Sequence, residues 1–315
     1  NNNNRQTAFV NSDAGAGFTN SSTADLSLPG GSTVRFAGLY WGARANANSN
    51  TRGTLQFRTP AMGAYQAITA SQIDTITNQG TNTSRPYMAF ADVTSLVQAG
   101  GNGTYRAGGM TAVNGSDGLG FYGGWTLVVV YENPADPFRR LMVFDGSASV
   151  TSGSPISVTA SGLLTPLAGA FTTRMGALVW EGDLDLTGDN FRLNGNNLSD
   201  ALNPAANFWN SSITRLGTRF SAKNPDYVNQ LGMDLDYVDA SGILANGATT
   251  ATLQFTSSGD VYFPQMLAFA VDLFVPDLVT SLSKSAVDLN GGELLPGDTL
   301  EYTIAFTYFS HDAAT

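Results

Sequence analysis

The sequence predicts an all-β protein, a large β-sandwich or jelly-roll-like domain, and three observations support that fold class. Its apolar residues recur mostly with a period of two, in short stretches rich in β-branched and aromatic side chains. Turn-forming clusters separate these stretches, and the 315 residues include 35 glycines and 12 prolines. Helical patterns are rare. Together these features are typical of strands joined by short turns.

Eight stretches have the composition and the alternation of strands. They are residues 33–41, 54–58, 125–131, 140–144, 155–160, 177–180, 251–256 and 262–274. A short helix is expected after the Asp92 cap, over residues 92–97, and should end at Gly100-Gly101. One further helical turn is expected over Leu198–Leu202, before Asn203-Pro204. Neither helix is long enough to form a layer of its own.

The stretch Trp125–Tyr131 differs from the other strands because its apolar residues occupy successive positions. This pattern is typical of a strand that is covered on both faces. We therefore expect it in the middle of the molecule.

A domain boundary is predicted near Val275-Pro276, where a long apolar strand ends and a new pattern begins. Residues 1–275 form the first domain in this interpretation. Residues 276–315 form the opening strands of a second, immunoglobulin-like module, with turns at Asn290-Gly291-Gly292 and at Pro296-Gly297-Asp298. Two or three strands cannot bury a sandwich core. We expect further chain after Thr315, or a strand donated by another molecule, to complete this module.

Charge and composition exclude several classes of function. The formal net charge of −10 leaves no basic surface for nucleic acid or anionic membrane. No apolar run approaches the roughly 20 residues of a membrane helix. The chain has no cysteine, which removes disulfides and thiolate chemistry.

The second module resembles a known repeat in three segments, Pro276–Lys284, Asp288–Gly292 and Pro296–Ile304. They are similar to the start of the conserved tandem immunoglobulin-like repeat of large secreted and surface proteins of bacteria, whose specific function is unknown. The sequence departs from that repeat after Thr307, where Tyr308-Phe309-Ser310-His311 replaces an Asn-Thr-Gly-like turn. This departure favours an extended course or a different strand partner.

The preceding residues resemble the β-rich module that often stands before such repeats. The phrases that carry this resemblance are Ala37–Gly42, Gly123–Glu132, Glu181–Asp183, Leu198–Pro204 and Ser258–Pro264. The resemblance implies an extracellular or cell-surface bacterial protein, in which the repeats form a stalk and the first module faces outward or mediates assembly.

Few residues of the sequence have the types and spacing of a catalytic site. The one histidine, His311, is adjacent to Ser310 and Asp312, but neighbours in an extended chain point to opposite faces and cannot converge on one substrate atom. The glycines of Gly118–Gly123 precede a strand, whereas a dinucleotide fingerprint follows a strand and opens a helix. Paired aspartates remain as a generic route to glycoside hydrolysis. We expect a protein that is not an enzyme.

Calcium is the one cofactor that the sequence suggests. Asp183, Asp185, Thr187 and Asp189 occupy the first, third, fifth and seventh positions of a loop with glycine at the sixth, as in a helix-loop-helix calcium site. The twelfth position holds Asn194 instead of glutamate. The alternative is a polar strand face, because Leu184 and Leu186 alternate with the acids. Asp234, Asp236 and Asp239 form a second candidate set.

Lys284 is a candidate for an isopeptide crosslink, because it lies on a first strand where some surface immunoglobulin-like modules join lysine to asparagine. The alternative is an exposed lysine that discourages strand pairing at an edge.

Six aromatic residues near turns could contact a sugar or belong to the core, namely Tyr40, Trp41, Phe121, Tyr122, Phe208 and Trp209.

These observations predict a non-catalytic extracellular surface or fibre protein that acts in adhesion or self-assembly. Strand addition through the C-terminal module would join copies into a homo-oligomer or filament. The alternative is a module that binds a host or matrix glycan, and a carbohydrate-active enzyme is the third interpretation.

Overall fold

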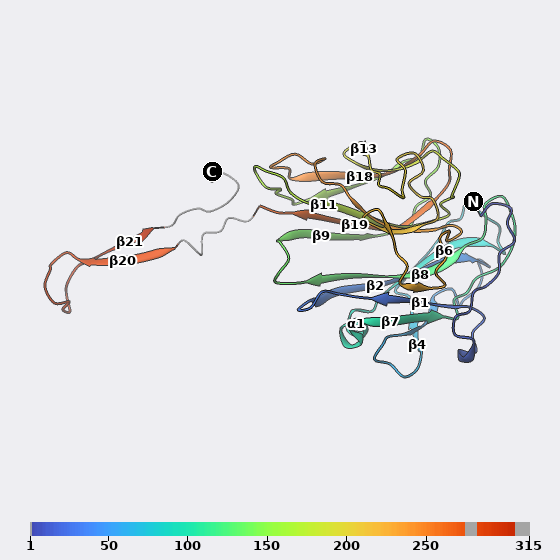
Figure 1. Cartoon of the computed structure of the whole chain (residues 1–315), viewed down its shortest axis with the longest axis horizontal. Coiled ribbons are helices and arrows are strands. Elements are labelled where there is room, and N and C mark those ends of the chain that lie inside the picture. Colours follow the sequence, from blue (N-terminus) through green and yellow to red (C-terminus); the bar gives the residue numbers. More distant parts are fainter. Residues whose placement is uncertain (1, 275–281, 306–315) are drawn as a thin grey trace.

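The computed structural model describes residues 2–274 and 282–305. It is nearly all β, with 45% strand and 3% helix, so the predicted all-β sandwich class is confirmed. Four sheets are stacked on one another, and a two-stranded hairpin lies outside the stack (Figure 1). We number the sheets I to IV in the order of stacking. All eight predicted strands are present, with ends shifted by a few residues.

Sheets I and II form the first sandwich. Sheet I has the order β16 (Lys223–Asn224), β1 (Ser21–Leu26), β7 (Gly103–Gly108), β3 (Thr54–Arg58) and β4 (Gln66–Thr69). Sheet II has the order β5 (Gln72–Thr75), β6 (Arg85–Asp92), β2 (Thr33–Ala45) and β8 (Gly123–Glu132). Every described pairing in these two sheets is antiparallel.

Sheets III and IV form the second sandwich. Sheet III has the order β15 (Thr218–Arg219), β14 (Ile213–Arg215), β17 (Met233–Asp239), β11 (Thr173–Trp180), β19 (Phe263–Asp272) and β9 (Arg139–Asp145). Sheet IV has the order β10 (Ile156–Ser161), β18 (Thr250–Ser257), β12 (Asp189–Leu193) and β13 (Asn196–Asn197). β14 runs parallel to β17, whereas the other described pairings are antiparallel.

Three apolar cores separate the four sheets. Leu39 and Trp41 of β2 belong to the core between sheets I and II. Tyr40, the residue between them, points to the other face and belongs to the core between sheets II and III. The core between sheets III and IV gathers Phe191, Phe208, Trp209 and Phe255, among other residues. Sheet II is therefore covered on both faces, which explains the successive apolar residues of β2.

Glycine allows sheets II and III to approach closely. A Cβ atom at Gly42 of β2 would lie 2.8 Å from a ring carbon of Trp180 on β11 and 2.9 Å from the backbone oxygen of Tyr87. Any larger residue at this position would push the two sheets apart.

The helices are short, as predicted. α1 (Thr94–Gly100) follows Asp92, whose Oδ1 accepts a hydrogen bond from the Thr94 amide at 2.8 Å, and it ends at Gly101 with φ of 63°. A 3₁₀ turn, η1, spans Ala14–Ala16. The helical turn predicted over Leu198–Leu202 is wrong. There the Asp200 carboxylate accepts the amides of Leu202 and Asn203 and forms a side-chain-closed turn instead.

The central position predicted for Trp125–Tyr131 is also wrong. These residues belong to β8, which pairs with β2 on one side only and ends sheet II. Most of its side chains are half-buried. The pattern identified a strand between two apolar surfaces correctly, but it carries no information about how many neighbours the strand has within its sheet.

The hairpin consists of β20 (Ser283–Asp288) and β21 (Leu300–Ala305), which pair with each other and with no other described strand. Residues 289–299 connect them and include both predicted turns, Asn290-Gly291-Gly292 and Pro296-Gly297-Asp298, whose three glycines have positive φ. The predicted domain boundary at Val275-Pro276 lies outside the described residues, as does His311, and the two-domain division stays a prediction. Among the described residues, no helix has the length and the apolar character of a membrane span.

Candidate functional site

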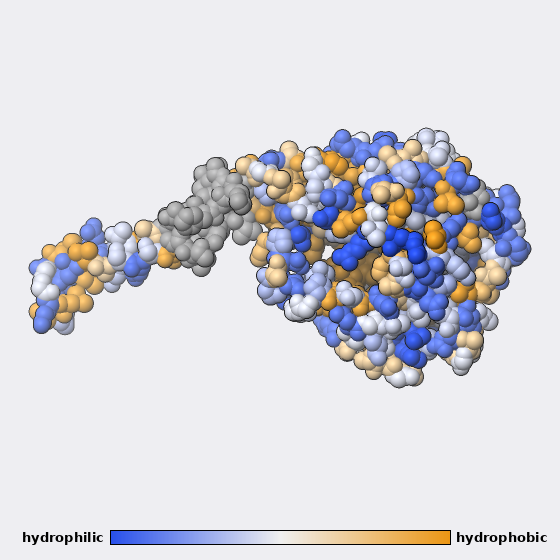
Figure 2. All heavy atoms as spheres, viewed as in Figure 1, coloured by the Kyte–Doolittle hydropathy of each residue, from blue (hydrophilic) through white to orange (hydrophobic). Residues whose placement is uncertain are grey.

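A cavity of about 1150 Å³ lies along the outer edge of β8. Sheet I forms one wall and sheet III the opposite wall. Figure 2 shows a hollow in this face of the molecule, with apolar residues inside it. We call this cavity the β8 slot. The segments that define it are Ser21–Leu26 of β1, Gly123–Glu132 of β8, Ile213–Arg215 of β14, Leu235–Tyr237 of β17 and Ala268–Ala270 of β19.

Both faces of β8 contribute to the β8 slot. Trp125, Leu127 and Val129 pack toward sheet I, and the Trp125 indole donates a 2.7 Å hydrogen bond to Ser22 Oγ of β1. Val128 packs toward sheet III. Because residues of both faces line the cavity, the cavity surrounds the edge of the strand. Among the described residues no strand pairs with that edge, so its outward N–H and C=O groups are available to a further strand.

Small residues leave room on the sheet III side. Ala268 and Ala270 of β19 and Gly176 of β11 line the cavity, and a Cβ atom at Gly176 would lie 2.9 Å from the Tyr237 ring. At the rim, Arg215 of β14 is exposed and forms no ion pair within the described part of the chain. The β8 slot is thus a mainly apolar groove whose lining carries charged side chains of both signs.

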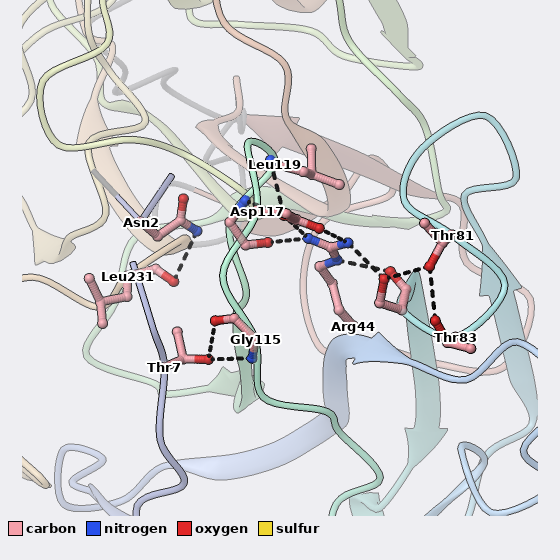
Figure 3. Close-up of polar contacts among 11 residues, drawn as sticks. Asn2, Thr7, Arg44, Thr81, Thr83, Gly115, Asp117, Leu119 and Leu231 are labelled. Atoms are coloured by element: carbon pink, nitrogen blue, oxygen red, sulfur yellow. Dashed lines mark hydrogen bonds and ion pairs between the residues drawn. The ribbon is translucent and has the colours of Figure 1, made fainter. Parts of the chain in front are cut away.

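A polar clamp holds one end of the β8 slot (Figure 3). Arg44 of β2 is fully buried, and its five N–H groups all have acceptors. Nη1 and Nη2 donate to the two carboxylate oxygens of Asp117 at 2.6 and 2.7 Å, Nη1 also donates to Gly120 O, and Nε and Nη2 donate to the backbone and side-chain oxygens of Ser84. The guanidinium carbon lies 4.1 Å from the centre of the Phe121 ring. Hydrogen bonding from Arg44 lowers the pKa of Asp117.

The clamp fixes the loop that leads into β8. Phe121 and Tyr122 of this loop line the cavity. The N-terminal segment supports the same loop, because the Thr7 amide donates to Gly115 O at 3.1 Å and the Gly115 amide donates to Thr7 Oγ1 at 3.3 Å. Residues far apart in sequence therefore hold the end of the β8 slot in a fixed shape.

Of the predicted calcium residues, Asp183, Asp185 and Thr187 lie in the loop before β12, and Asp189 is the first residue of β12. The alternative of one polar strand face that carries all four residues is therefore wrong. Asp183 and Asp189 are buried, whereas Asp185 and Thr187 are exposed. Asp183 accepts hydrogen bonds from the Asn2 amide at 3.0 Å and from Asn3 Nδ2 at 2.8 Å, and so holds the N-terminal segment.

Calcium stays a prediction, and a chelator that lowers the melting temperature would support it. Within residues 2–274 and 282–305, no three acidic or histidine side chains form a group that could hold one metal ion. Of the second candidate set, Asp234 and Asp236 are buried and Asp239 is exposed, where it forms an ion pair with Arg174.

Several buried carboxyl groups have raised pKa values. Burial raises the pKa of Asp189 to about 6 and that of Asp260 to about 8, and the neighbouring Asp189 charge contributes to the second shift. Burial also raises the pKa of Asp234 and of Glu181. One oxygen each of Asp189, Asp234 and Asp260 has no hydrogen-bond partner among the described residues. Burial thus favours the protonated forms of these carboxyl groups, and with a pKa of about 8 Asp260 is mainly protonated at neutral pH.

Lys284, the isopeptide candidate, is exposed on β20. Its Nζ lies 4.3 Å from the centre of the Tyr302 ring on β21, a cation–π contact across the hairpin. A crosslink to asparagine stays a prediction.

The six aromatic residues considered for sugar binding are all buried. Phe208 and Trp209 pack against Phe191 between sheets III and IV, and Tyr122 stacks on Trp180. The core interpretation of these side chains is confirmed. Gly118 and Gly120 belong to the loop before β8, Gly123 is the first residue of β8, and none of the three opens a helix.

Most of the chain matches one known protein family. A family model described as "Protein of unknown function (DUF3344)" matches residues 8–269. The chain belongs to the DUF3344 family. The DUF3344 region includes all four sheets except the last residues of β19. It contains the β8 slot apart from Thr7 and Ala270, whereas β20 and β21 lie outside it.

No curated protein matches the chain. Among solved structures, one of the infectious bursal disease virus Gx strain is similar at 13% identity with a TM-score of 0.23. The similarity covers 81% of this chain and 57% of the viral chain, so the chain spans a little over half of that protein's length. We draw no conclusion about fold or function from it.

Sequence reasoning did not find the β8 slot. The signal was present in Trp125–Tyr131, whose apolar residues on successive positions indicated cover on both faces. A strand with this composition at the end of a sheet requires apolar surroundings on the open side as well. The clamp at Arg44 gave no signal, because its partners Ser84 and Asp117 are separated from it by 40 and 73 positions.

Proposed function

We propose that the chain is a non-catalytic surface or fibre component of a bacterium, and that it acts in self-assembly or adhesion by strand addition. The hairpin β20–β21 is the part of the chain that would recruit a neighbouring molecule. The four stacked sheets would form the body of each subunit.

The exposed hairpin is the observation that carries this proposal. Its apolar side chains are between 55% and 64% exposed, namely those of Val287, Leu289, Leu294, Leu295, Tyr302 and Ile304. A two-stranded hairpin is marginally stable in water by itself. Strands with free edges and exposed apolar side chains pair readily with other strands.

The extracellular location is supported by composition and by the resemblance to secreted bacterial proteins. An acidic chain without cysteine is compatible with exposure outside the cell. Brief protease treatment of intact cells tests this part of the proposal. Loss of the chain from treated cells, with a cytoplasmic marker retained, supports a surface location, whereas full protection contradicts it.

Assembly is tested on the whole 315-residue chain by light scattering and electron microscopy. Ile304→Lys adds a charge to the apolar face of β21, and we expect this variant to stay monomeric while the parent chain assembles. Asn290→Lys, in the exposed turn of the same hairpin, is the matched control and should assemble like the parent. Truncation after Val275 should also leave a soluble monomer. Assembly that persists without the hairpin would contradict the proposal.

The glycan-binding alternative depended on six aromatic side chains that are all buried. The two that line the β8 slot, Phe121 and Tyr122, are only 7% and 6% exposed. Binding on a glycan array that survives Ile304→Lys would reopen it.

A further inference from the structure

We propose that β21 of a second copy, together with the residues that follow it up to Phe309, enters the β8 slot and pairs with the free edge of β8. This inference rests on the proposed function and names the acceptor site for the strand that the hairpin donates. The β8 slot and the hairpin are both apolar surfaces that the described chain leaves uncovered, one concave and the other extended.

The acceptor has the dimensions of a strand position. Sheet II lies between sheets I and III, and its last strand, β8, leaves an apolar space between those sheets beyond its free edge. Stacked sheets are about 10 Å apart, so the layer between two outer sheets holds one sheet. An added strand there would hydrogen-bond to β8 and pack against β1 on one face and β17 on the other.

The donor has the matching chemistry. Leu300, Tyr302 and Ile304 share one face of β21, and the last two are exposed. The sequence continues as Ala305-Phe306-Thr307-Tyr308-Phe309, where apolar residues occupy both odd and even positions. The even positions from Leu300 to Tyr308 are all apolar or aromatic, whereas the odd positions are mixed, with Glu301 and two threonines beside Ala305 and Phe309. An added strand would therefore turn its apolar face to one wall of the β8 slot and its mixed face to the other.

The lengths also agree. β8 has ten residues, and the segment from Leu300 to Phe309 has ten. At about 3.3 Å per residue, a strand of ten residues is roughly 33 Å long, so β8 is long enough to pair with a fully extended donor of ten residues. The donor carries one charged residue, Glu301. The lining of the β8 slot has four acidic and four basic side chains, and Arg215 is the basic one without an ion-pair partner in the described residues, so it is available to pair with Glu301.

A second copy is the occupant because one chain leaves both surfaces uncovered. Within a single chain the hairpin lies outside the β8 slot (Figures 1 and 2). A donor on one surface and an acceptor on another form a head-to-tail contact, which generates an open filament when it does not close into a ring. The proposed fibre follows from this one contact.

Cysteine crosslinking tests the contact directly, because the chain has no cysteine of its own. One variant carries Val129→Cys in the β8 slot and the other carries Ile304→Cys in the hairpin. Leu127→Cys and Tyr131→Cys, on the same face of β8, allow for a shift in register. After mixing under mild oxidation, we expect a disulfide-linked dimer that contains one copy of each variant, with at least tenfold more product than the control.

The control replaces the acceptor by Ser157→Cys on β10. This strand also ends its sheet and is exposed there, but it does not line the β8 slot. Equal crosslinking to Ser157→Cys and to the β8 positions would overturn the proposal, because it would indicate unspecific contact. Crosslinking within one chain that carries both Val129→Cys and Ile304→Cys, in dilute monomer, would overturn it in favour of the chain's own hairpin.

A blocking variant separates this inference from the proposed function. Val129→Arg places a charge in the β8 slot, and a thermal melt close to that of the parent shows that the variant is folded. We expect this variant to stay monomeric.

Assembly of Val129→Arg, together with monomeric Ile304→Lys, would overturn the β8 slot as acceptor and leave assembly through the hairpin intact. A parent chain that never assembles would overturn both. A small apolar molecule found in the β8 slot by native mass spectrometry, with no crosslinked dimer, would also overturn the inference.

Discussion

β2 and β8 are neighbours in sheet II and share a sequence pattern, but their surroundings differ. Both have apolar residues on successive positions, and Trp41 of β2 stands directly opposite Trp125 of β8. β2 has a strand on each side, and Trp41 is fully buried. β8 has a strand on one side only, and Trp125 is half-buried beside the cavity.

The difference shows that cover on both faces and pairing on both edges are separate properties of a strand. Side-chain pattern depends on the faces, because side chains point above and below the sheet. Hydrogen bonding depends on the edges and involves only the backbone. β8 has the side chains of a central strand and the backbone of an edge strand, which is the combination expected of an acceptor for a further strand.

The two tryptophans provide the largest expected effect. Trp41→Ala should lower the free energy of unfolding by about 3–5 kcal/mol, because it empties a fully buried site. Trp125→Ala should lower the free energy of unfolding of the monomer by about half as much, because the Trp125 side chain already borders an open cavity. Chemical denaturation of the two variants measures the difference. An equal or greater loss for Trp125→Ala would show that the edge of β8 is closed.

Two arginines of β2 offer the next comparison. Arg44 is fully buried with five hydrogen bonds, whereas Arg35 and its partner Glu132 are 60% and 61% exposed. We expect Arg44→Ala to destabilise the fold by about 3 kcal/mol, since buried acceptors lose their donors. Arg35→Ala should change stability by less than about 1 kcal/mol. The same denaturation series measures both, and similar losses would contradict a structural clamp at the end of the β8 slot.

The second sandwich contains buried carboxyl groups, and these make the stability of the protein depend on pH. Burial raises the pKa of Asp260 to about 8, so this carboxyl is protonated in the folded state over a range where the unfolded state has lost its proton. The stabilisation that protonated Asp260 gives to the folded state is fully present below pH 4 and is lost as the pH rises through about 8. Over this range the free energy of unfolding falls by at most about 1.4 kcal/mol per pH unit.

Melting temperatures of the monomeric Ile304→Lys variant at several pH values measure this effect. We expect the melting temperature to fall between pH 5 and pH 8, and Asp260→Asn to flatten that decline. Asp136→Asn, at an exposed position, is the control and should leave the profile unchanged. A melting temperature that rises over this range would contradict the interpretation of Asp260 as a buried neutral acid.

Salt provides the smallest expected effect. The copies carry a formal net charge of −10 and repel one another, although the proposed contact is mainly apolar. Raising the ionic strength from about 0.01 M to 0.15 M shortens the screening length from about 30 Å to 8 Å, so assembly should become faster. Light scattering measures the rate. Slower assembly in salt would indicate that attraction between charges dominates the contact.

The sequence predicted much of the fold and little of the site. Strands such as β3 and β18 were located within one residue of their ends, because alternating β-branched and aromatic residues leave few other solutions. Short polar strands such as β13 and β16 were missed, because their pairing depends on neighbours far away in the chain. The division into four layers was also missed, since the face of β2 that meets sheet III and the face that meets sheet I have the same apolar character.

The β8 slot could not be predicted for a related reason. Its walls come from β1, β14, β17 and β19, and no local pattern indicates which of these strands meet across a cavity. The apolar run of β8 predicted its burial but not its free edge. The buried carboxyl groups raise the same difficulty, because Asp189 and Asp260 interact across 71 positions of sequence.

Hydrogen exchange along β8 tests the central claim most directly. Amides of residues 123–132 are compared between the assembled parent chain and the monomeric Ile304→Lys variant, with β2 as the internal reference. We expect exchange in β8 to slow at least tenfold on assembly, because the outward amides gain partners, while β2 stays slow in both states. Equal exchange of β8 in assembled and monomeric protein would contradict strand addition at this edge.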